Sequence, residues 1–182
     1  MSRAELKRRF LKHVFADQLG LFPAIPVGAV MTPRPFTVSA DCPAAQLVKL
    51  FHEKQFRHFL VSDEGLLAGI ISDRDVIPYF GRSARPDDLK RLTAADLMST
   101  ELVTVRSTTL LVKAIERMVN AGINSLPVVE RGEVIGIVTS TDIFLTLEQV
   151  LQRALAAQEA SIISPRHRDC SETASATEGP SL

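Results

Sequence analysis

The sequence predicts an α/β fold in which one small β-α-β-β-α unit occurs twice. The main observation is an internal repeat with a constant offset of 67 residues: residues 69–75 read GIISDRD and residues 136–142 read GIVTSTD. The same offset pairs Met31 with Met98 without a gap. Two copies of a unit this long indicate two small domains packed on each other, rather than the many stacked turns of a solenoid.

A helix in each copy follows from apolar residues spaced at i, i+3, i+4 and i+7. Short apolar strands are expected before these helices, over residues 36–38 and 102–105. Asp41 and Thr108 stand where side chains commonly cap a helix, so they are predicted to be the caps. The apolar faces are Ala44, Leu47, Val48 and Phe51 in the first copy, and Leu111, Ala114, Ile115 and Met118 in the second.

A β-hairpin is predicted after each of these helices. In the first copy residues 58–62 and 66–71 flank a turn that contains Gly65, and in the second copy residues 126–129 and 134–138 flank Gly132. Glycine at this place suits a tight hairpin loop. A short helix is then expected from about Asp73 and again from about Ser140.

Segments outside the repeat complete the predicted organisation. An N-terminal helical segment, a linker with a turn of helix near its end, and a long C-terminal helix are expected from the apolar spacing. The last stretch is rich in Ser, Thr, Ala and charge, so it is predicted to be a disordered tail. The boundaries are 1–26 for the N-terminal segment, 27–80 for repeat 1, 81–93 for the linker, 94–147 for repeat 2, 148–163 for the C-terminal helix and 164–182 for the tail.

Composition bounds the class of protein. The 182 residues include 21 Lys and Arg and 21 Asp and Glu, so the chain as a whole has no basic excess for binding a polyanion. Cys42 and Cys170 are too far apart in sequence to suggest a disulfide framework, and a reducing, cytoplasmic location is expected. No apolar run approaches the ~20 residues of a membrane span, and the N-terminus lacks the apolar core of a secretion signal.

The repeated motifs resemble the CBS-domain family, named for cystathionine β-synthase. The resemblance is carried by residues 30–33 (VMTP) and 97–99 (LMS), which open the copies, and by residues 124–129 (NSLPVV). The Gly-to-Asp segments that end at Asp75 and Asp142 match the signature of the family. The resemblance covers residues 27–147, about two-thirds of the chain, and the chain is similar to stand-alone CBS-pair proteins.

The resemblance implies that the two repeats pack pseudo-symmetrically into one Bateman module, and that modules pair into a homodimer. It also implies a cleft that binds an adenine ligand such as AMP, ADP, ATP or S-adenosylmethionine, with magnesium beside a polyphosphate. Such modules regulate another protein, so a ligand-sensing role without catalytic activity is expected, with an unidentified regulated partner.

The resemblance gives Asp75 and Asp142 the role of accepting the two ribose hydroxyls, which a carboxylate can do with its two oxygens. Thr37, Val38, Thr104 and Val105 match the segment whose backbone reads the adenine edge. Hydroxyls, amides and cations near the signature suit phosphate oxygens. The full predicted set is Thr37, Val38, Arg57, His58, Ser72, Arg74, Asp75, Thr104, Val105, Asn124, Ser125, Thr139, Thr141 and Asp142.

Each of these residues also has a plain structural interpretation. Ser, Thr and Asp are the preferred helix caps, so the aspartates and their hydroxyl neighbours are equally suited to capping. Arg57 and Arg74 are also typical of ion-paired surface residues. Thr37, Val38, Thr104 and Val105 are equally typical of ordinary strands, because their side chains alone identify no site. The first copy has more cations than the second and is expected to suit a polyphosphate better.

The first copy departs from the family pattern at two positions. Gln55 stands where Gly122 ends the helix of the second copy, so the first helix is expected to end differently. Leu60 stands where the second copy has Pro127.

Other chemistry finds little support in the sequence. The histidines have no metal-ligand spacing, and no nucleophile arrangement or phosphate-binding glycine loop is present, so the chain is not expected to be an enzyme. Two alternatives to ligand sensing stay open: a structural dimerisation or adaptor module with empty clefts, and a nucleic-acid binder that uses the basic residues Arg3, Lys7, Arg8, Arg9 and Lys12.

Overall fold

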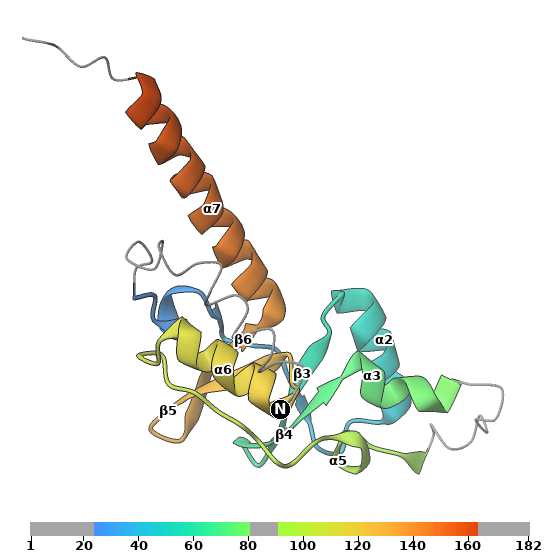
Figure 1. Ribbon diagram of the computed structural model, residues 1–182. Helices are drawn as coiled ribbons and strands as arrows, with labels where there is room; N and C mark the ends of the chain where they lie inside the picture. Colours follow the sequence, from blue (N-terminus) through green and yellow to red (C-terminus); the bar gives the residue numbers. More distant parts are fainter. Residues whose placement is uncertain (1–23, 81–90, 164–182) are drawn as a thin grey trace, which may run out of the picture. The chain divides into compact units, whose positions relative to one another are not determined.

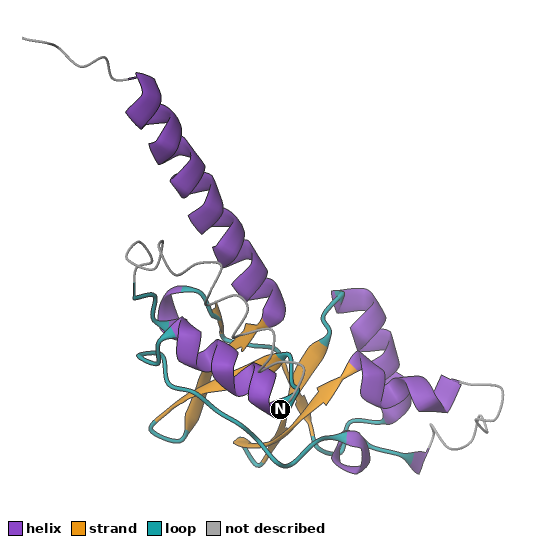
Figure 2. Cartoon of the chain, in the orientation of Figure 1, coloured by secondary structure: helices purple, strands orange, loops and turns teal. Residues whose placement is uncertain are grey.

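The computed structural model describes residues 24–80 and 91–163 (Figure 1). Within these residues helices and strands alternate as the α/β prediction requires (Figure 2). The predicted N-terminal helical segment, most of the linker and the predicted disordered tail lie outside the described residues. The chain divides into two compact units, with the boundary between Thr146 and Leu147.

The first copy contributes two 3-10 helices, all three strands of one sheet and one strand of the other. Its elements are η2 (Val27–Ala29), β1 (Thr32–Pro33), β2 (Thr37–Ser39), α2 (Ala44–Lys54), β3 (His58–Asp63), β4 (Leu66–Ser72), α3 (Asp73–Val76) and η3 (Ile77–Phe80). The second copy contributes α5 (Ala94–Leu97), α6 (Leu111–Ala121), β5 (Ser125–Glu130), β6 (Glu133–Thr139) and α7 (Ser140–Ile163).

Both predicted hairpins are confirmed. Strands β3 and β4 pair antiparallel with His58 opposite Ser72, and β5 and β6 pair antiparallel with Ser125 opposite Thr139. The strand order is β2-β3-β4 in one sheet and β1-β6-β5 in the other. The two sheets therefore place the signature segments, which span the ends of β4 and β6 and the helix starts after them, in matching positions.

The two copies exchange their opening segments. Strand β1 begins the first copy but pairs with β6 of the second, with Thr32 opposite Ile137. In the reciprocal direction Ser99 of the second copy bridges Ile70 of β4, through backbone hydrogen bonds of 2.9 and 3.0 Å. Each packed half of the module is therefore built from both sequence repeats.

The exchange also supplies the starts of the two main helices. The first helical N–H group of α2, on Ala44, donates to the carbonyl of Leu92 at 2.8 Å. The corresponding N–H of α6, on Leu111, donates to the carbonyl of Ile25 at 2.8 Å. A backbone carbonyl from the exchanged segment thus satisfies a donor that would otherwise need a side-chain cap.

The predicted caps were therefore wrong. Helix α2 starts after Pro43 and α6 starts after Leu110, and neither has a side-chain cap hydrogen bond. Asp41 and Thr108 lie two residues before these positions, too early to reach the first free N–H groups. Sequence spacing alone could not show that a distant carbonyl would take the place of the cap.

The predicted apolar faces are confirmed, because the main helices pack on their sheets through them. Most of each face is fully buried, while Val48 and Ile115 at the edges are partly buried. Ala94 is buried in the core of the first sheet and Val27 in that of the second, as the exchange requires. One core gathers Val38, Leu47, Phe51, Phe59, Val61 and Ile71, and the other Val105, Leu111, Ala114, Met118, Leu126, Val128 and Val138.

The strand predicted over residues 102–105 is reduced to one bridge. Val105 donates to the carbonyl of Pro127 at 3.1 Å and accepts from Val129 at 2.9 Å. In the first copy β2 instead pairs with β3 over three residues, with Leu60 at the place of Pro127. Proline has no N–H to donate, so the parallel ladder cannot extend past this residue.

The helices α2 and α6 end in the same way, against expectation. Gln55 adopts the left-handed conformation with φ 56°, and Gly122 adopts it with φ 69°. Gln55 also donates from Nε2 to the carbonyl of His52 at 2.6 Å. The first copy therefore keeps the geometry of the glycine end and carries a conformational cost there of about 1 kcal/mol.

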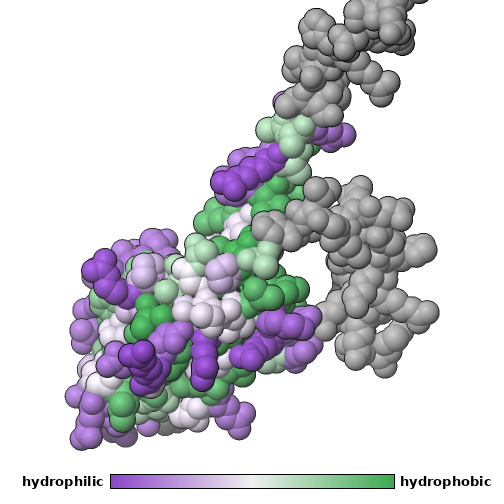
Figure 3. Space-filling model, turned by 90° about the vertical axis from the view of Figure 1, so that its left-hand side faces the viewer, coloured by the Kyte–Doolittle hydropathy of each residue, from purple (hydrophilic) through white to green (hydrophobic). Residues whose placement is uncertain are grey.

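Helix α7 joins the short helix predicted near Ser140 to the predicted C-terminal helix, and it spans 24 residues. Leu147, Leu151 and Leu155 project from it with 48%, 51% and 61% of their surface exposed. Figure 3 shows this apolar character in green along the described part of the helix. Their spacing places the three leucines on one side of α7.

The exchanged segments lie so close to the sheets that a methyl group added at a glycine of β4 or β6 is predicted to destabilise the fold. A Cβ at Gly69 would overlap the side chain of Met98, and a Cβ at Gly136 would overlap that of Met31. Gly69→Ala should therefore lower the free energy of unfolding by about 1–3 kcal/mol, measured by urea denaturation. In a chain that also carries Met98→Ala the same substitution should cost less. Equal costs in both backgrounds would contradict this packing.

The helix ends give a reciprocal prediction. Gln55→Gly should raise the free energy of unfolding by about 1 kcal/mol, because glycine reaches positive φ without strain. Gly122→Gln should lower it by a similar amount. A Cβ at Gly122 would meet nothing within 4 Å, so this cost is conformational rather than steric. Thermal or urea unfolding of both variants measures the two changes in the free energy of unfolding. Two changes of the same sign would contradict the conformational strain assigned to Gln55.

Candidate functional site

One cavity of about 1080 Å³ lies in the first compact unit, between elements of both copies. Its walls repeat with the 67-residue offset: every lining residue except Ala121 has its counterpart from the other copy in the wall. Leu60 and Ile70 from one sheet face Pro127 and Ile137 from the other as matched apolar pairs. A cavity of this size can hold a drug-sized ligand and is larger than most such sites.

Ten of the fourteen residues predicted for the site line this cavity. They reach it from the hairpins, the segments before them and the helix starts that follow them. These ten are Arg57, His58, Ser72, Arg74, Asp75, Asn124, Ser125, Thr139, Thr141 and Asp142.

The four residues predicted to read the adenine edge do not line the cavity. Val38 and Val105 are buried in the two cores, with 6% and 3% of their surface exposed. Thr37 lies beside Val38 on a separate shallow hollow of about 360 Å³. Thr104 offers its carbonyl to Nη1 of Arg117 at 2.8 Å. The side chains of these four residues therefore add nothing to the cavity wall, and the contact of their backbone with the adenine edge stays a prediction.

Asp75 and Asp142 each close a capping box at the start of a helix. Oδ2 of Asp75 accepts from the backbone N–H and the hydroxyl of Ser72 at 2.6 and 2.7 Å. Oδ2 of Asp142 accepts from the same two groups of Thr139, both at 2.7 Å. The capping interpretation is thus realised in both copies, and it engages one oxygen of each carboxylate.

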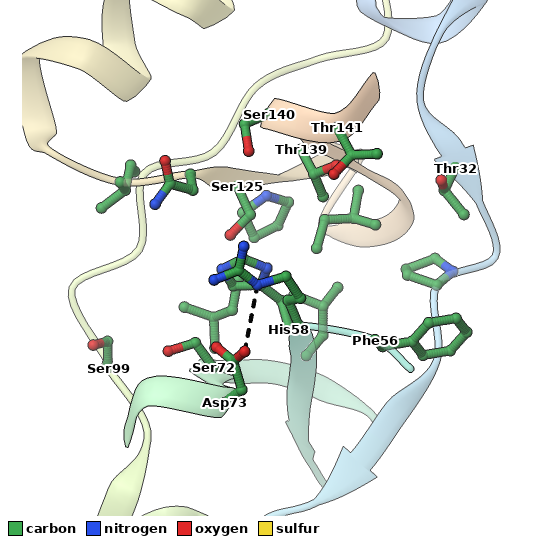
Figure 4. Close-up of a pocket in the computed structure, with 18 of the residues that line it drawn as sticks. Thr32, Phe56, His58, Ser72, Asp73, Ser99, Ser125, Thr139, Ser140 and Thr141 are labelled. Carbon is green, nitrogen blue, oxygen red and sulfur yellow. Dashed lines mark hydrogen bonds and ion pairs between the residues drawn. The ribbon is translucent and has the colours of Figure 1, made fainter. Parts of the chain in front are cut away.

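The second oxygen of each aspartate carries the remaining acceptor capacity. Oδ1 of Asp142 accepts from Thr32 Oγ1 at 3.5 Å, a long contact from the exchanged strand β1. Ser99, the counterpart of Thr32 at the 67-residue offset, also lines the cavity and lies on the side of Ser72 in Figure 4. Each half of the cavity is therefore completed by a hydroxyl residue from the opposite copy.

A third capping box lies away from the cavity. Asp96 Oδ2 accepts from the N–H and hydroxyl of Thr93 at 2.8 and 2.9 Å, at the start of α5. These hydrogen bonds hold the pKa of Asp96 below its usual value. The motif by itself therefore does not indicate a ligand, and it is the position of Asp75 and Asp142 in the cavity wall that distinguishes them.

Charge in the cavity is unequally distributed between the copies. Nε of Arg57 lies 3.3 Å from Oδ2 of Asp73, the pair marked by the dashed line in Figure 4. The matching positions in the second copy are Asn124 and Ser140, which are uncharged. The cationic character expected of the first copy is thus offset by a carboxylate of the same copy.

His58 lies at the start of β3 and is half-buried in the cavity wall. Burial is the main influence on its ring and holds the pKa below the ordinary histidine value of 6.5. The charges of Asp73 and Asp75 oppose this shift, and those of Arg57 and Arg74 add to it. The neutral ring is therefore favoured, so His58 can donate to a ligand through one nitrogen and accept through the other.

The second copy presents a neutral polar wall at the corresponding place. Ser125 takes the position of His58 and retains 6% of its surface exposed. The backbone N–H of Ser140 donates to the carbonyl of Asn124 at 2.9 Å, which ties the start of α7 to the segment before β5. This half of the cavity suits hydroxyl and amide groups of a ligand.

Sequence reasoning missed the aromatic and exchanged residues of the cavity. Phe36 and Phe56 line the first half, and both lie against Phe59 with ring centroids 5.6 and 6.0 Å apart. Their counterparts in the second half are Val103 and Ile123. The 67-residue offset gives the pairing of these positions, but only the folded chain shows that they face the cavity.

The described residues contain no candidate metal site and no candidate membrane-spanning helix. In residues 24–80 and 91–163 no group of three or more His, Cys, Asp or Glu side chains is placed to hold a metal ion. Over the same ranges no helix is long and apolar enough to cross a membrane.

The model of the CBS domain family matches residues 27–82 and 94–149, so the chain belongs to this family and forms a tandem CBS pair. Among curated proteins, the CBS domain-containing protein CBSCBSPB5 of Arabidopsis thaliana is 33% identical over 103 residues, 57% of this chain and 17% of the plant protein. The homoserine O-acetyltransferase of Methanohalobium evestigatum is 29% identical over 115 residues, 62% of this chain and 22% of that enzyme. The chain thus spans less than a quarter of both proteins.

Solved structures share the fold over most of their length. CBSX2, solved in complex with AMP, is 27% identical with a TM-score of 0.59, and the match covers 69% of this chain and 97% of CBSX2. The CBS domain pair of MJ0100, solved with 5′-methylthioadenosine and S-adenosyl-L-methionine, is 24% identical with a TM-score of 0.62. That match covers 70% of this chain and 98% of the MJ0100 pair, and it shows the likeness of fold alone.

The lowered pKa of His58 predicts a loss of stability in mild acid. Between pH 6.5 and the lower pKa of the folded state, the unfolded chain binds a proton that the folded chain does not, so stability falls as the pH falls. His58→Gln should reduce this slope when unfolding is measured at several pH values. His52→Gln, on the exposed surface of α2, is the matched control and should keep the wild-type slope. Identical slopes in all three proteins would exclude this role of His58.

Proposed function

We propose that this chain binds an adenosine-containing ligand in the cavity between its two CBS repeats and regulates a partner according to whether the ligand is present. The observation that carries the proposal is the cavity itself, in which two aspartates, several hydroxyls and an apolar wall converge from both copies. The AMP complex of CBSX2, a relative by fold with 27% identity, supports this class of ligand.

The aspartates supply the polar end of the proposed site. Asp75 and Asp142 use Oδ2 for their capping boxes, so each keeps Oδ1 as the better acceptor for a ribose hydroxyl. The capping hydrogen bonds hold each carboxylate in place before the ligand arrives. A ribose then meets an oriented acceptor and loses less free energy to ordering it.

The apolar wall supplies the other end. Phe36 and Phe56 expose 42% and 47% of their surface, and both line the cavity. Burying a purine against aromatic and aliphatic side chains removes apolar surface from water and allows ring contacts. The first half, with its phenylalanines, is therefore the better place for the base.

Regulation follows from the way the cavity joins the two copies. Its walls include Asp75 at the start of α3 and Asp142 in the first turn of α7, so a ligand held by both would favour one arrangement of these elements. A ligand shifts such an equilibrium only by its difference in affinity for the two arrangements. The proposed role includes no catalytic step. It includes the formation of a homodimer with a second copy of this CBS pair.

A structural adaptor with empty clefts is the second candidate. The observation that favours it is that the aspartates are already satisfied by their capping boxes, and Arg57 by Asp73, without any ligand. On this view the polar residues of the cavity only hold the helix starts.

Ligand-dependent unfolding separates these candidates. We expect AMP, ADP, ATP or S-adenosylmethionine, tested with and without magnesium, to raise the melting temperature of the wild-type chain. A ligand at 100 times its Kd contributes ~2.7 kcal/mol, which is about 5–11 °C for a chain of this size. No shift with any of the ligands would reject the sensor and support the adaptor.

Substitutions of the three capping aspartates locate the ligand. Asp75→Asn, Asp142→Asn and Asp96→Asn should each cost about 0.5–2 kcal/mol of stability without ligand, because each weakens a helix start. Only the first two should also reduce the ligand-induced shift, since Asp96 lies outside the cavity wall. An equal reduction in all three variants would assign the aspartates to folding alone.

A further inference from the structure

We propose that the cavity selects adenosine ligands with one phosphate or none over di- and triphosphates, and that Asp73 is the residue that determines this selectivity by pairing with Arg57. This inference rests on the proposed function and specifies its ligand class. It reverses the preference for polyphosphate that the arginines of the first copy suggest from sequence.

Two contacts fix the pair of Arg57 and Asp73. The side chains meet at 3.3 Å between Nε and Oδ2. In addition, the backbone N–H of Asp73 donates to the carbonyl of Arg57 at 3.1 Å, at the junction of β4 and α3. The carboxylate is thereby held beside the guanidinium, where it competes with any phosphate for the same cation.

The other charges of the wall do not restore a cationic excess. The described lining residues include three arginines, Arg34, Arg57 and Arg74, against four carboxylates. Besides Asp73, the carboxylates are Asp75, Glu101 and Asp142. A triphosphate brings up to four negative charges into this wall, so its chain would meet net repulsion.

Neither half of the cavity wall, taken separately, carries an excess of positive charge. Arg34 follows β1 and its N–H donates to Ile135 of the second sheet at 3.1 Å, so it belongs to the half that contains Asp142. Its counterpart at the 67-residue offset, Glu101, follows Ser99, which bridges Ile70 of the first sheet. The exchange thus brings a carboxylate to the half that holds Arg57 and Arg74, and neither half gains an excess of cations.

Arg74 can still serve a single phosphate. Among the described residues no ion pair to Arg74 is formed, in contrast to Arg57. The second copy has Thr141 at this position and Ser140 in place of Asp73. The guanidinium of Arg74, which pairs with no described carboxylate, and these neutral hydroxyls suit a monophosphate or an uncharged 5′ group, and they provide too little positive charge for a triphosphate.

A role in ligand selectivity explains the ion pair of Arg57 and Asp73 better than a contribution to the stability of the fold does. The two side chains expose 62% and 36% of their surface. An ion pair this exposed to water contributes little to folding. Removing the carboxylate should therefore leave the fold intact while it changes the charge that a ligand meets, which makes the inference testable by substitution.

The experiment compares three adenosine ligands by isothermal titration calorimetry of the full chain: 5′-methylthioadenosine, AMP and ATP. The buffer contains low salt and EDTA, so that ATP keeps its full charge. Wild-type chain should bind ATP about tenfold or more weakly than AMP. Asp73→Asn should strengthen ATP binding about tenfold, the effect of one charge removed near a phosphate chain, and leave 5′-methylthioadenosine within about twofold.

Glu101→Gln is the matched control within the cavity, because it removes the same charge from a residue that does not pair with Arg57. Asp63→Asn, at the last residue of β3, controls for charge outside the cavity. Glu101→Gln should strengthen ATP binding by less than about threefold, and Asp63→Asn should not change it.

The outcomes separate the two proposals. If ATP binds the wild type as tightly as AMP, the selectivity is wrong and the proposed function stands. If Glu101→Gln matches the gain of Asp73→Asn, the role assigned to the ion pair is wrong. If none of the three ligands binds any of the proteins, the proposed function is rejected and the selectivity with it.

Discussion

Each copy of the repeat opens with a segment that packs in the other copy, and the cores, the helix starts and the cavity all depend on this exchange. Met31 lies over Gly136 and Met98 lies over Gly69, where an added Cβ would overlap the methionine side chain. The same segments supply backbone partners to β4 and β6 and a carbonyl to the first N–H of α2 and of α6. A copy without its partner would lack part of its core and an acceptor at its main helix, so the pair is the folding unit.

In the proposed function, each aspartate of the signature would serve folding and binding together. Oδ2 of Asp75 and of Asp142 satisfies the N–H and hydroxyl of the preceding Ser72 or Thr139. This contact orients the carboxylate and leaves Oδ1 as an acceptor at the cavity. The physical advantage is preorganisation, because the free energy of ordering the side chain is spent on folding rather than on binding.

The near-symmetric geometry carries unequal chemistry. The exchange places Thr32 and Ser99 at matching points of the cavity, while His58, Asp73 and Arg74 of the first copy face the uncharged residues Ser125, Ser140 and Thr141 of the second. Backbone hydrogen bonds fix the arrangement of the strands and helix starts, so side chains that do not contribute to this arrangement can differ between the copies. In the proposed function, the two halves would therefore meet different parts of one ligand, or two ligands of different charge.

Local sequence determined the elements of this protein, and tertiary structure decided which of them meet. The hairpins, the apolar helix faces and the signature segments could be predicted because they depend on periodicity and turn residues, and most of the residues predicted for the site line the cavity. The helix starts and the pairing of Arg57 with Asp73 could not, since they depend on contacts between residues far apart in the chain. Val38 and Val105 were predicted to read the adenine edge through their backbone, and the folded chain adds that their side chains are buried in the cores. The 67-residue offset revealed the symmetry, but it could not show that each copy completes the other.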